Sequence, residues 1–157
     1  MKFKKKIDYN KIGNFVKKIS LSKEFRKNRN LSNAPWKYLN DSNVDFYSFE
    51  EMNKIIGVMV IIQHKYVNHL TFLYVLKEYR NLGIGNEFMK YYKKNYNKKI
   101  LTIHVTKKLK RTISFYSEFG FEIYKTKYKN NIIQKWKNNC LKTNKNSYKN
   151  RLLLFFK

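Results

Sequence analysis

The hydrophobic pattern in the first third of the chain has the three- and four-residue spacing of a helix. One apolar stripe predicts helical structure within residues 8–30, and it consists of Ile12, Phe15, Val16 and Ile19. A second short helix is predicted over Ser22–Asn28. Residues 31–41 contain the only proline of the chain among Asn and Ser residues, which indicates a loop.

The middle of the chain consists of short runs that are β-branched, aromatic and largely apolar, as is typical of strands. The run Lys54–His64 is apolar almost throughout, which favours a central strand buried on both faces. Helical spacing returns in Asn86–Tyr96 and Arg111–Phe119, and Gly120 would end the second helix. The other predicted strands cover Val44–Glu50, His69–Val75 and Lys99–Thr106, and a final hairpin covers residues 121–128 and 132–137. This order predicts an α/β domain on a mixed sheet.

The length of 157 residues fits one domain with a single core, which we expect to span residues 1–137. Residues 138–157 are polar and basic up to the apolar run Leu152–Phe156, and they are predicted to form a peripheral basic C-terminal tail. Five adjacent apolar side chains rarely stay exposed. The run is therefore expected to dock as an apolar plug or at a dimer contact.

The single cysteine, Cys140, excludes a disulfide framework within the chain and a Cys/His zinc cluster, and it fits a reducing setting. The basic N-terminus is not followed by the apolar stretch of a signal peptide. The longest apolar run, Ile55–Ile62, has eight residues, whereas a membrane-spanning helix needs about 20. We expect a cytoplasmic protein without a membrane partner, as a monomer or a homodimer.

The net charge of +25, from 35 Lys and Arg against 10 Asp and Glu, has two interpretations. A polyanionic partner such as tRNA, the ribosome or DNA would be attracted by this charge at long range. Alternatively, the charge reflects a composition that is rich in Lys, Asn, Ile and Tyr. The lysines are spread along the whole chain, which favours the compositional interpretation without excluding the first.

The chain has five glycines, and two of them, Gly83 and Gly85, lie together between a predicted strand and a predicted helix. Glycines allow close backbone approach to a ligand, and the N–H groups of a helix N-terminus bind phosphate. Arg80 adds a permanent positive charge. A dinucleotide-binding loop would need a third glycine where Phe88 stands, and the Gly-Lys-Ser/Thr of a P-loop is absent.

The remaining pattern, Arg80-x-x-Gly83-x-Gly85, resembles the cofactor loop of the GNAT acetyltransferases. The segments Leu73–Val75 and Glu78–Arg80 are similar to the family's usual sequence around this loop, with Lys77 in place of its proline. A second motif, Phe115–Phe121, is similar to the family's Phe-Tyr-x-Lys-x-Gly-Phe segment and lies about 30 residues downstream. The resemblance covers roughly residues 40–137.

This resemblance implies a GNAT-like α/β fold, with a mixed, strongly twisted central sheet that is flanked by helices. The strand ending at Val75 and the strand containing Leu101–Val105 should splay apart, and the helices at 86–96 and 111–119 should lie on opposite faces or flanks of the sheet. The implied activity is acetyl transfer from acetyl-CoA to a primary amine by direct attack in a ternary complex, without a metal. A non-catalytic acyl-CoA-binding or RNA-associated module on the same fold is the alternative.

The resemblance also assigns roles to individual residues. Tyr116 matches the tyrosine that protonates the departing thiolate, and a phenol stays protonated at neutral pH. His104 stands on the strand where some members carry a catalytic glutamate, and histidine suits a general base. Glu50 and Glu51 are rival bases. The acetyl-CoA-binding residues are expected to be Leu73, Tyr74, Val75, Arg80, Asn81, Leu82, Gly83, Ile84, Gly85 and Lys110. The sequence does not identify the amine that accepts the acetyl group.

Overall fold

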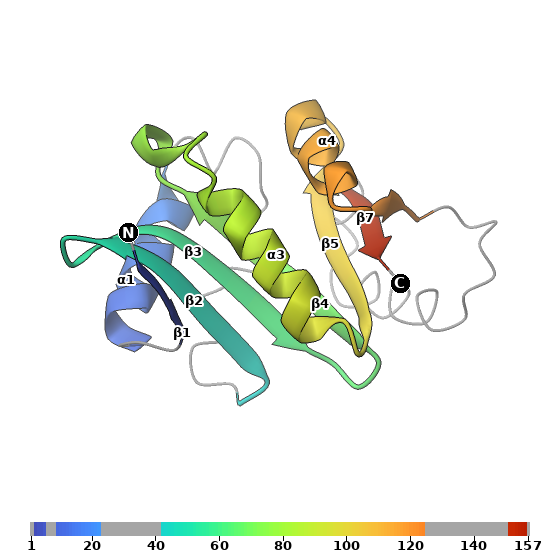
Figure 1. Cartoon of the computed structure of the whole chain (residues 1–157), viewed down its shortest axis with the longest axis horizontal. Coiled ribbons are helices and arrows are strands. Elements are labelled where there is room, and N and C mark those ends of the chain that lie inside the picture. Colours follow the sequence, from blue (N-terminus) through green and yellow to red (C-terminus); the bar gives the residue numbers. More distant parts are fainter. Residues whose placement is uncertain (1, 6–8, 23–41, 125–150, 157) are drawn as a thin grey trace.

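A computed structural model describes residues 2–5, 9–22, 42–124 and 151–156. Its strands form one seven-stranded sheet in the order β1-β2-β3-β4-β5-β7-β6 (Figure 1). The strands are β1 Lys2–Lys5, β2 Val44–Glu51, β3 Lys54–Gln63, β4 Val67–Val75, β5 Ile100–Thr106, β6 Glu122–Ile123 and β7 Arg151–Phe156. The helices are α1 Tyr9–Leu21, the 3₁₀ turn η3 Lys77–Tyr79, α3 Ile84–Tyr96 and α4 Lys110–Glu118. The predicted α/β fold class is confirmed.

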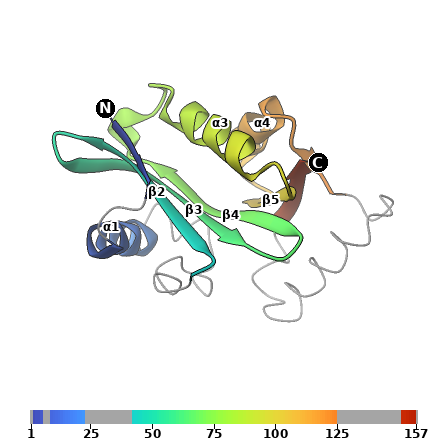
Figure 2. The ribbon, with the colours of Figure 1, turned by 60° about the horizontal axis from the view of Figure 1, so that its bottom comes forward.

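Helices cover both faces of the sheet (Figure 2). The apolar stripe of α1 packs on one face, where Ile12 and Val16 contact side chains of β2, β3 and β4. Helices α3 and α4 both pack on the other face, where Phe88 and Tyr116 belong to one core cluster with β5 side chains. Of the two arrangements predicted for these helices, opposite faces or opposite flanks, the first is excluded, because both helices lie on one face and over different parts of it. No helix in the described ranges is long and apolar enough to cross a membrane.

Strand β3 is buried almost throughout, as its continuous apolar run predicted. The space for α3 on this strand is made at Gly57. A Cβ there would lie 3.1 Å from Cε2 of Phe88 and 3.3 Å from Cγ2 of Ile84. A larger residue at position 57 would push the first two turns of α3 away from the sheet, because both contacts are tighter than ordinary van der Waals distances.

Strands β4 and β5 are parallel, and their pairing ends partway along β4. The ladder runs from Val67–Ile100 to Leu70–Ile103, after which β4 continues to Val75 and β5 to Thr106. Figure 1 shows the two strands diverging toward the start of α4. The predicted splay of these two strands is confirmed.

The last described segment differs from its prediction as an apolar plug or a dimer contact. Arg151–Phe156 is strand β7, which pairs antiparallel with β5 over six residues and places Leu154 in the core at 0% exposure. Strand β7 also pairs with β6, which lies in the part of the predicted hairpin that the structure describes, residues 121–124. The rest of that hairpin, most of the short helix predicted at 22–28, and the loop at 31–41 lie outside the described residues. The division of the chain at residue 137 stays a prediction.

Candidate active site

A cavity of about 550 Å³ lies where β4 and β5 diverge, which is within the usual size range of ligand sites. Its walls come from the end of β4, the loop before α3, and the first turns of α3 and α4. The predicted site residues that line it are Leu73, Tyr74, Val75, Arg80, Asn81, Gly83, Ile84, Gly85 and Tyr116. The fold thus brings two motifs that are far apart in the sequence to one cavity.

The loop before α3 is shaped by two residues in the left-handed region. Asn81 has a φ of 66° and Gly83 a φ of 80°, and Asn and Gly are the residues that adopt such angles most readily. A Cβ at Gly83 would meet nothing within 4 Å, so this position requires glycine for its backbone angle and not for packing. The open space beside Gly83 belongs to the cavity, and a ligand can therefore approach the backbone closely.

The N-terminus of α3 offers uncapped N–H groups to this space. Gly83 is the N-cap residue and makes no side-chain cap, whereas helices commonly use Ser, Thr, Asp or Asn there. The first-turn residues Ile84, Gly85 and Asn86 line the cavity. The first N–H groups of a helix lack intrahelical partners and carry its positive dipole end, so this wall favours an anion.

The N-terminus of α4 faces the same cavity, but through residues other than the predicted Lys110. Its N-cap residue, Leu109, also makes no side-chain cap, and Arg111 and Thr112 from its first turn line the cavity. Lys110, which was predicted to bind the cofactor, is not among the lining residues. With 3.6 residues per turn, neighbouring positions point in directions about 100° apart. Residues four apart lie on the same face of a helix. The sequence signal for Thr112 as a cavity residue was therefore Tyr116, and the signal for Arg111 was Phe115.

Arg80 is held at the edge of the cavity by two contacts. Its Nε donates a hydrogen bond to the carbonyl oxygen of Val75 at 3.1 Å, and its guanidinium carbon lies 5.3 Å from the ring centroid of Tyr74. Together with Arg111, it places positive charge beside the two helix N-termini. Leu82 was predicted to be part of this site, but its side chain is 56% exposed and does not line the cavity.

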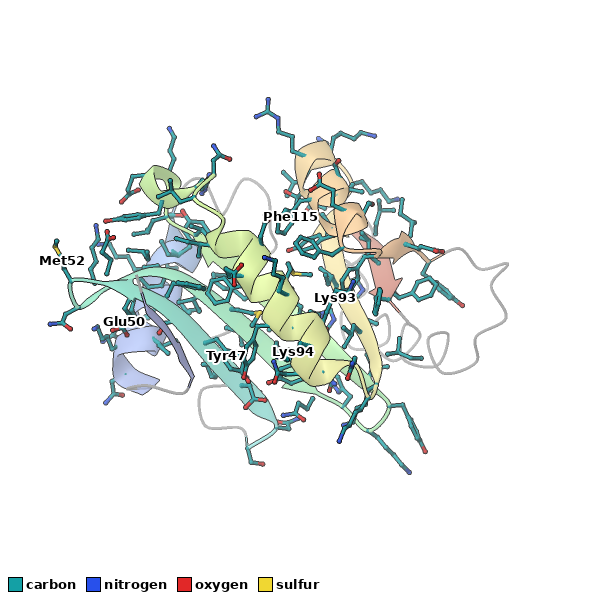
Figure 3. The ribbon with its side chains drawn as sticks, viewed as in Figure 1. Tyr47, Glu50, Met52, Lys93, Lys94 and Phe115 are labelled. Atoms are coloured by element: carbon teal, nitrogen blue, oxygen red, sulfur yellow. The ribbon has the colours of Figure 1, made fainter. Side chains whose placement is uncertain are left out.

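Tyr116 lies on the wall that α4 contributes and is only 4% exposed. Its ring packs against Phe115 and Phe121, at centroid distances of 5.3 and 6.3 Å. Phe115 itself lies between α3 and α4, 3.3 Å from the position that a Cβ of Gly85 would take (Figure 3). This packing fixes the orientation of the Tyr116 side chain, so the phenol is pre-positioned.

His104 does not line the cavity. Its neighbours Ile103 and Val105 point into the core cluster beneath α3 and α4, so His104, which alternates with them along β5, projects from the opposite face. It is half-buried there, and its ring packs edge-to-face against His69 with centroids 5.1 Å apart. It is the first β5 residue after the last β4–β5 pair at Ile103.

The rival bases are placed elsewhere. Glu50 is 4% exposed on β2, and its carboxylate lies 3.7 Å from the Lys11 ammonium and 3.4 Å from the Ser48 hydroxyl. Neither Glu50 nor Glu51 lines the cavity. Within the described residues, no group of three or more His, Cys, Asp or Glu side chains is arranged to hold a metal ion.

Diverging parallel strands, with a glycine turn and two helix N-termini at the gap between them, define an α/β protein with a site suited to an anionic ligand. This chain belongs to the GNAT acetyltransferase family, because residues 5–137 match the family described as "Acetyltransferase (GNAT) domain". No curated protein matches the chain.

Solved GNAT structures share this fold over nearly the whole chain. A GNAT acetyltransferase from Elizabethkingia anophelis, with acetyl-CoA bound, is 19% identical, and the match covers 99% of this chain and 97% of that one with a TM-score of 0.64. A GNAT acetyltransferase from Staphylococcus aureus Mu50 is 16% identical, with coverages of 98% and 96% and a TM-score of 0.67. The PaiA N-acetyltransferase from Thermoplasma acidophilum, in complex with coenzyme A, is 14% identical, with coverages of 100% and 99% and a TM-score of 0.63. At these identities the likeness establishes the fold.

Proposed function

We propose that this protein transfers the acetyl group of acetyl-CoA to a primary amine by direct attack in a ternary complex. The observation that carries the proposal is the cavity at the β4–β5 gap, which joins an anion-binding turn at Gly83 to a fixed phenol at Tyr116. The turn suits the phosphates of a nucleotide-bearing donor, and the phenol suits the protonation of a leaving group. The related protein from Elizabethkingia anophelis, solved with acetyl-CoA bound, supports this choice of donor.

The proposed donor binds along the walls of the cavity from the loop to the strands. Its pyrophosphate accepts hydrogen bonds from the N–H groups of Asn81–Gly85, beside the charges of Arg80 and Arg111. Its pantetheine arm pairs with the edge of Leu73–Val75, as an added strand would. That edge becomes available because the β4–β5 ladder ends at Leu70.

The proposed reaction forms one bond and breaks another without a covalent enzyme intermediate. The amine nitrogen attacks the acetyl carbonyl carbon, and the resulting oxyanion is stabilised by a backbone N–H near Val75. When the C–S bond breaks, the electron pair stays on sulfur, and the Tyr116 hydroxyl donates its proton to that thiolate. The products are an amide and CoA, and the amine loses one proton to a base.

His104 is the proposed base, and its position beside the β4–β5 gap supports this role. The donor cavity opens on the face of the sheet that carries α3 and α4, whereas His104 projects from the opposite face just beyond the last β4–β5 pair. An amine that approaches from that second face would reach the thioester through the gap between the strands. The acid and the base would then act from opposite sides of the reacting carbonyl.

The decisive test is thiol release from acetyl-CoA across a panel of amines: polyamines, aminoglycosides, lysine peptides and peptides with free N-termini. We expect amine-dependent release above the rate without acceptor, with one amide formed per thiol. Tight acetyl-CoA binding without release for any amine would instead favour the non-catalytic acyl-CoA-binding module. A polyanionic partner stays a separate prediction, because no observation on the described residues bears on it.

Replacing Arg111 by alanine is expected to weaken acetyl-CoA binding by about tenfold, because one charge-assisted contact to phosphate contributes roughly 1–2 kcal/mol. The matched control is Lys110→Ala, which removes the same charge one residue away but outside the cavity lining. Isothermal titration with acetyl-CoA measures both variants. Equal losses in the two would show that net charge, and not position on α4, governs binding.

Replacing His104 by alanine is expected to lower kcat mainly near neutral pH, with partial recovery at higher pH, where the amine loses its proton without a base. A pH–rate series on the wild type and the variant measures this difference. His104→Gln is the companion variant, since it keeps a polar side chain of similar size beside His69. A loss of thermal stability with an unchanged pH profile would identify His104 as structural.

A further inference from the structure

A second cavity, of about 300 Å³, lies at the other end of α3. It is formed by the start of β2, the end of β3, the start of β4 and the last turns of α3. A helix rises about 1.5 Å per residue, so Asn95 in this cavity lies about 15 Å along α3 from Gly85 in the first one. The second cavity is therefore distinct from the acetyl-transfer site.

The interior of this cavity is rich in hydrogen-bond acceptors. Asp45 is only 6% exposed, and its Oδ2 accepts hydrogen bonds from Nε2 of Gln63 at 2.6 Å and the hydroxyl of Tyr96 at 2.5 Å. Asn68 is 3% exposed, and its Nδ2 donates to the carbonyl oxygen of Tyr96 at 3.0 Å. That contact fixes the orientation of the amide, because the flipped form would place two acceptors together.

Asn68 Oδ1 is consequently a buried acceptor that receives no hydrogen bond from the part of the chain that the structure describes. A buried polar group without a partner costs about 1–3 kcal/mol, and such groups are rare in native proteins. A ligand that brings an N–H donor would remove this cost. The buried carboxylate of Asp45 in the same cavity favours a donor that is also positively charged.

Three tyrosine rings add a second feature that suits a cation. Tyr47, Tyr91 and Tyr96 all line the cavity, with centroids 4.8 Å apart for Tyr47 and Tyr91 and 6.4 Å apart for Tyr47 and Tyr96. Figure 3 shows Tyr47 on the side of the sheet that α3 covers. Burial raises the pKa of Tyr47 and of Tyr96 above the ordinary value, so both rings stay neutral phenols. Neutral aromatic rings attract an ammonium group placed at their faces.

The rim of the cavity has the opposite charge. Lys98 is exposed and Lys99 is half-buried, with its Nζ donating to the carbonyl oxygen of His64 at 2.8 Å. Two ammonium groups at the entrance repel a simple cation but attract a carboxylate. The cavity therefore presents acceptors and rings inside and positive charge at its mouth.

We propose that this second cavity binds a small zwitterion of the α-amino-acid type, with its ammonium group toward Asp45 and Asn68 and its carboxylate toward Lys98 and Lys99. This binding is independent of acetyl transfer, since none of these residues lines the first cavity. It is tested on the protein without acetyl-CoA, so its failure and the failure of the proposed enzyme activity are separate results.

The experiment measures the rise in melting temperature of the full chain with each standard α-amino acid at millimolar concentration, because a ligand of the native state raises it. The amino acid that raises the melting temperature most is then compared with its decarboxylated amine and its deaminated acid. We expect at least one amino acid to raise the melting temperature, and both truncated compounds to bind at least tenfold more weakly. No shift with any amino acid, or an amine that binds as tightly, would overturn the proposal.

Two lysine variants, one on α3 and one just after it, test the orientation of the bound amino acid without disturbing the fold. Lys98→Glu is expected to weaken amino-acid binding by tenfold or more, whereas Lys94→Glu, an exposed control outside this cavity, should leave it unchanged. Asp45→Asn should abolish binding, but it also alters a buried hydrogen-bond network. The comparison of Lys98→Glu with Lys94→Glu is therefore the decisive one. Equal binding by the two lysine variants would contradict the assigned carboxylate position.

Discussion

Replacing Tyr116 by phenylalanine is expected to lower kcat by about 10²–10⁴, the usual size of general acid–base assistance, while leaving acetyl-CoA affinity close to wild type. In the proposed reaction the hydroxyl donates to a thiolate that exists only as the C–S bond breaks, so its contribution belongs to the transition state. The phenylalanine ring of the variant stays in place, because Phe115 and Phe121 pack against the ring of residue 116. Steady-state kinetics and acetyl-CoA titration together measure the two quantities.

The matched control is Tyr92→Phe in the neighbouring helix. Tyr92 is fully buried in the same core cluster and donates to the carbonyl oxygen of Asn68 at 2.6 Å, but it does not line the cavity. Losing its hydroxyl should cost about 1–3 kcal/mol of stability and leave turnover unchanged. Wild-type turnover in Tyr116→Phe would remove the acid assignment. The cavity would stand, since its walls depend on Gly83 and the two helix N-termini.

Ending the chain after Asn139 is expected to prevent cooperative folding, the reverse of what a peripheral tail would give. The truncation removes β7, which supplies six residue pairs to β5 and the buried side chains of Leu153 and Leu154. Domains are stable by only about 5–15 kcal/mol, so the loss of an internal strand exceeds the available margin. Circular dichroism during thermal unfolding measures it, and a cooperative transition in the truncated chain would contradict this role of β7.

Point variants in the same strand separate packing from chain length. Leu154→Ala removes a side chain of 0% exposure from the main core cluster and should cost about 2–5 kcal/mol of unfolding free energy. Leu152→Ala is the control, because Leu152 lies in the same strand but is only partly buried. Chemical denaturation of both variants measures the difference.

Much of the local structure could be predicted from the sequence. The strands β2 to β5 and the helices α3 and α4 fall within about two residues of their predicted limits, because each carries its own apolar periodicity and turn residues. The turn at Gly83 and the helix end at Gly120 were also predictable, and both glycines have a positive φ, which glycine adopts readily. These features depend on neighbours a few residues away.

The errors in the sequence-based prediction of pairing and placement concern contacts between distant segments. Nothing near Arg151–Phe156 indicates that it pairs with β5, about 50 residues earlier, because a strand's partner depends on which sheet edge remains open. Helices α3 and α4 share one face of the sheet, and His104 projects from the other. Both results depend on how distant segments pack together in the folded chain. On α4, the choice of Arg111 over Lys110 as a cavity residue depends on the rotation of the helix on the sheet.

The amino-acid sequence alone predicted the order of the elements from β2 to α4, the glycine turn that opens α3, and the two motifs by which the chain resembles its family, but neither β1 nor β7. Three features became visible only in the folded chain. Strand β7 occupies the free edge of β5, the N-termini of α3 and α4 meet at one cavity, and Asp45 and Asn68 meet three tyrosines at a second. The physical reason is the range of the interactions. Periodicity and turn angles are set within a few bonds, whereas strand pairing, helix rotation and cavity lining are selected by how the whole core packs.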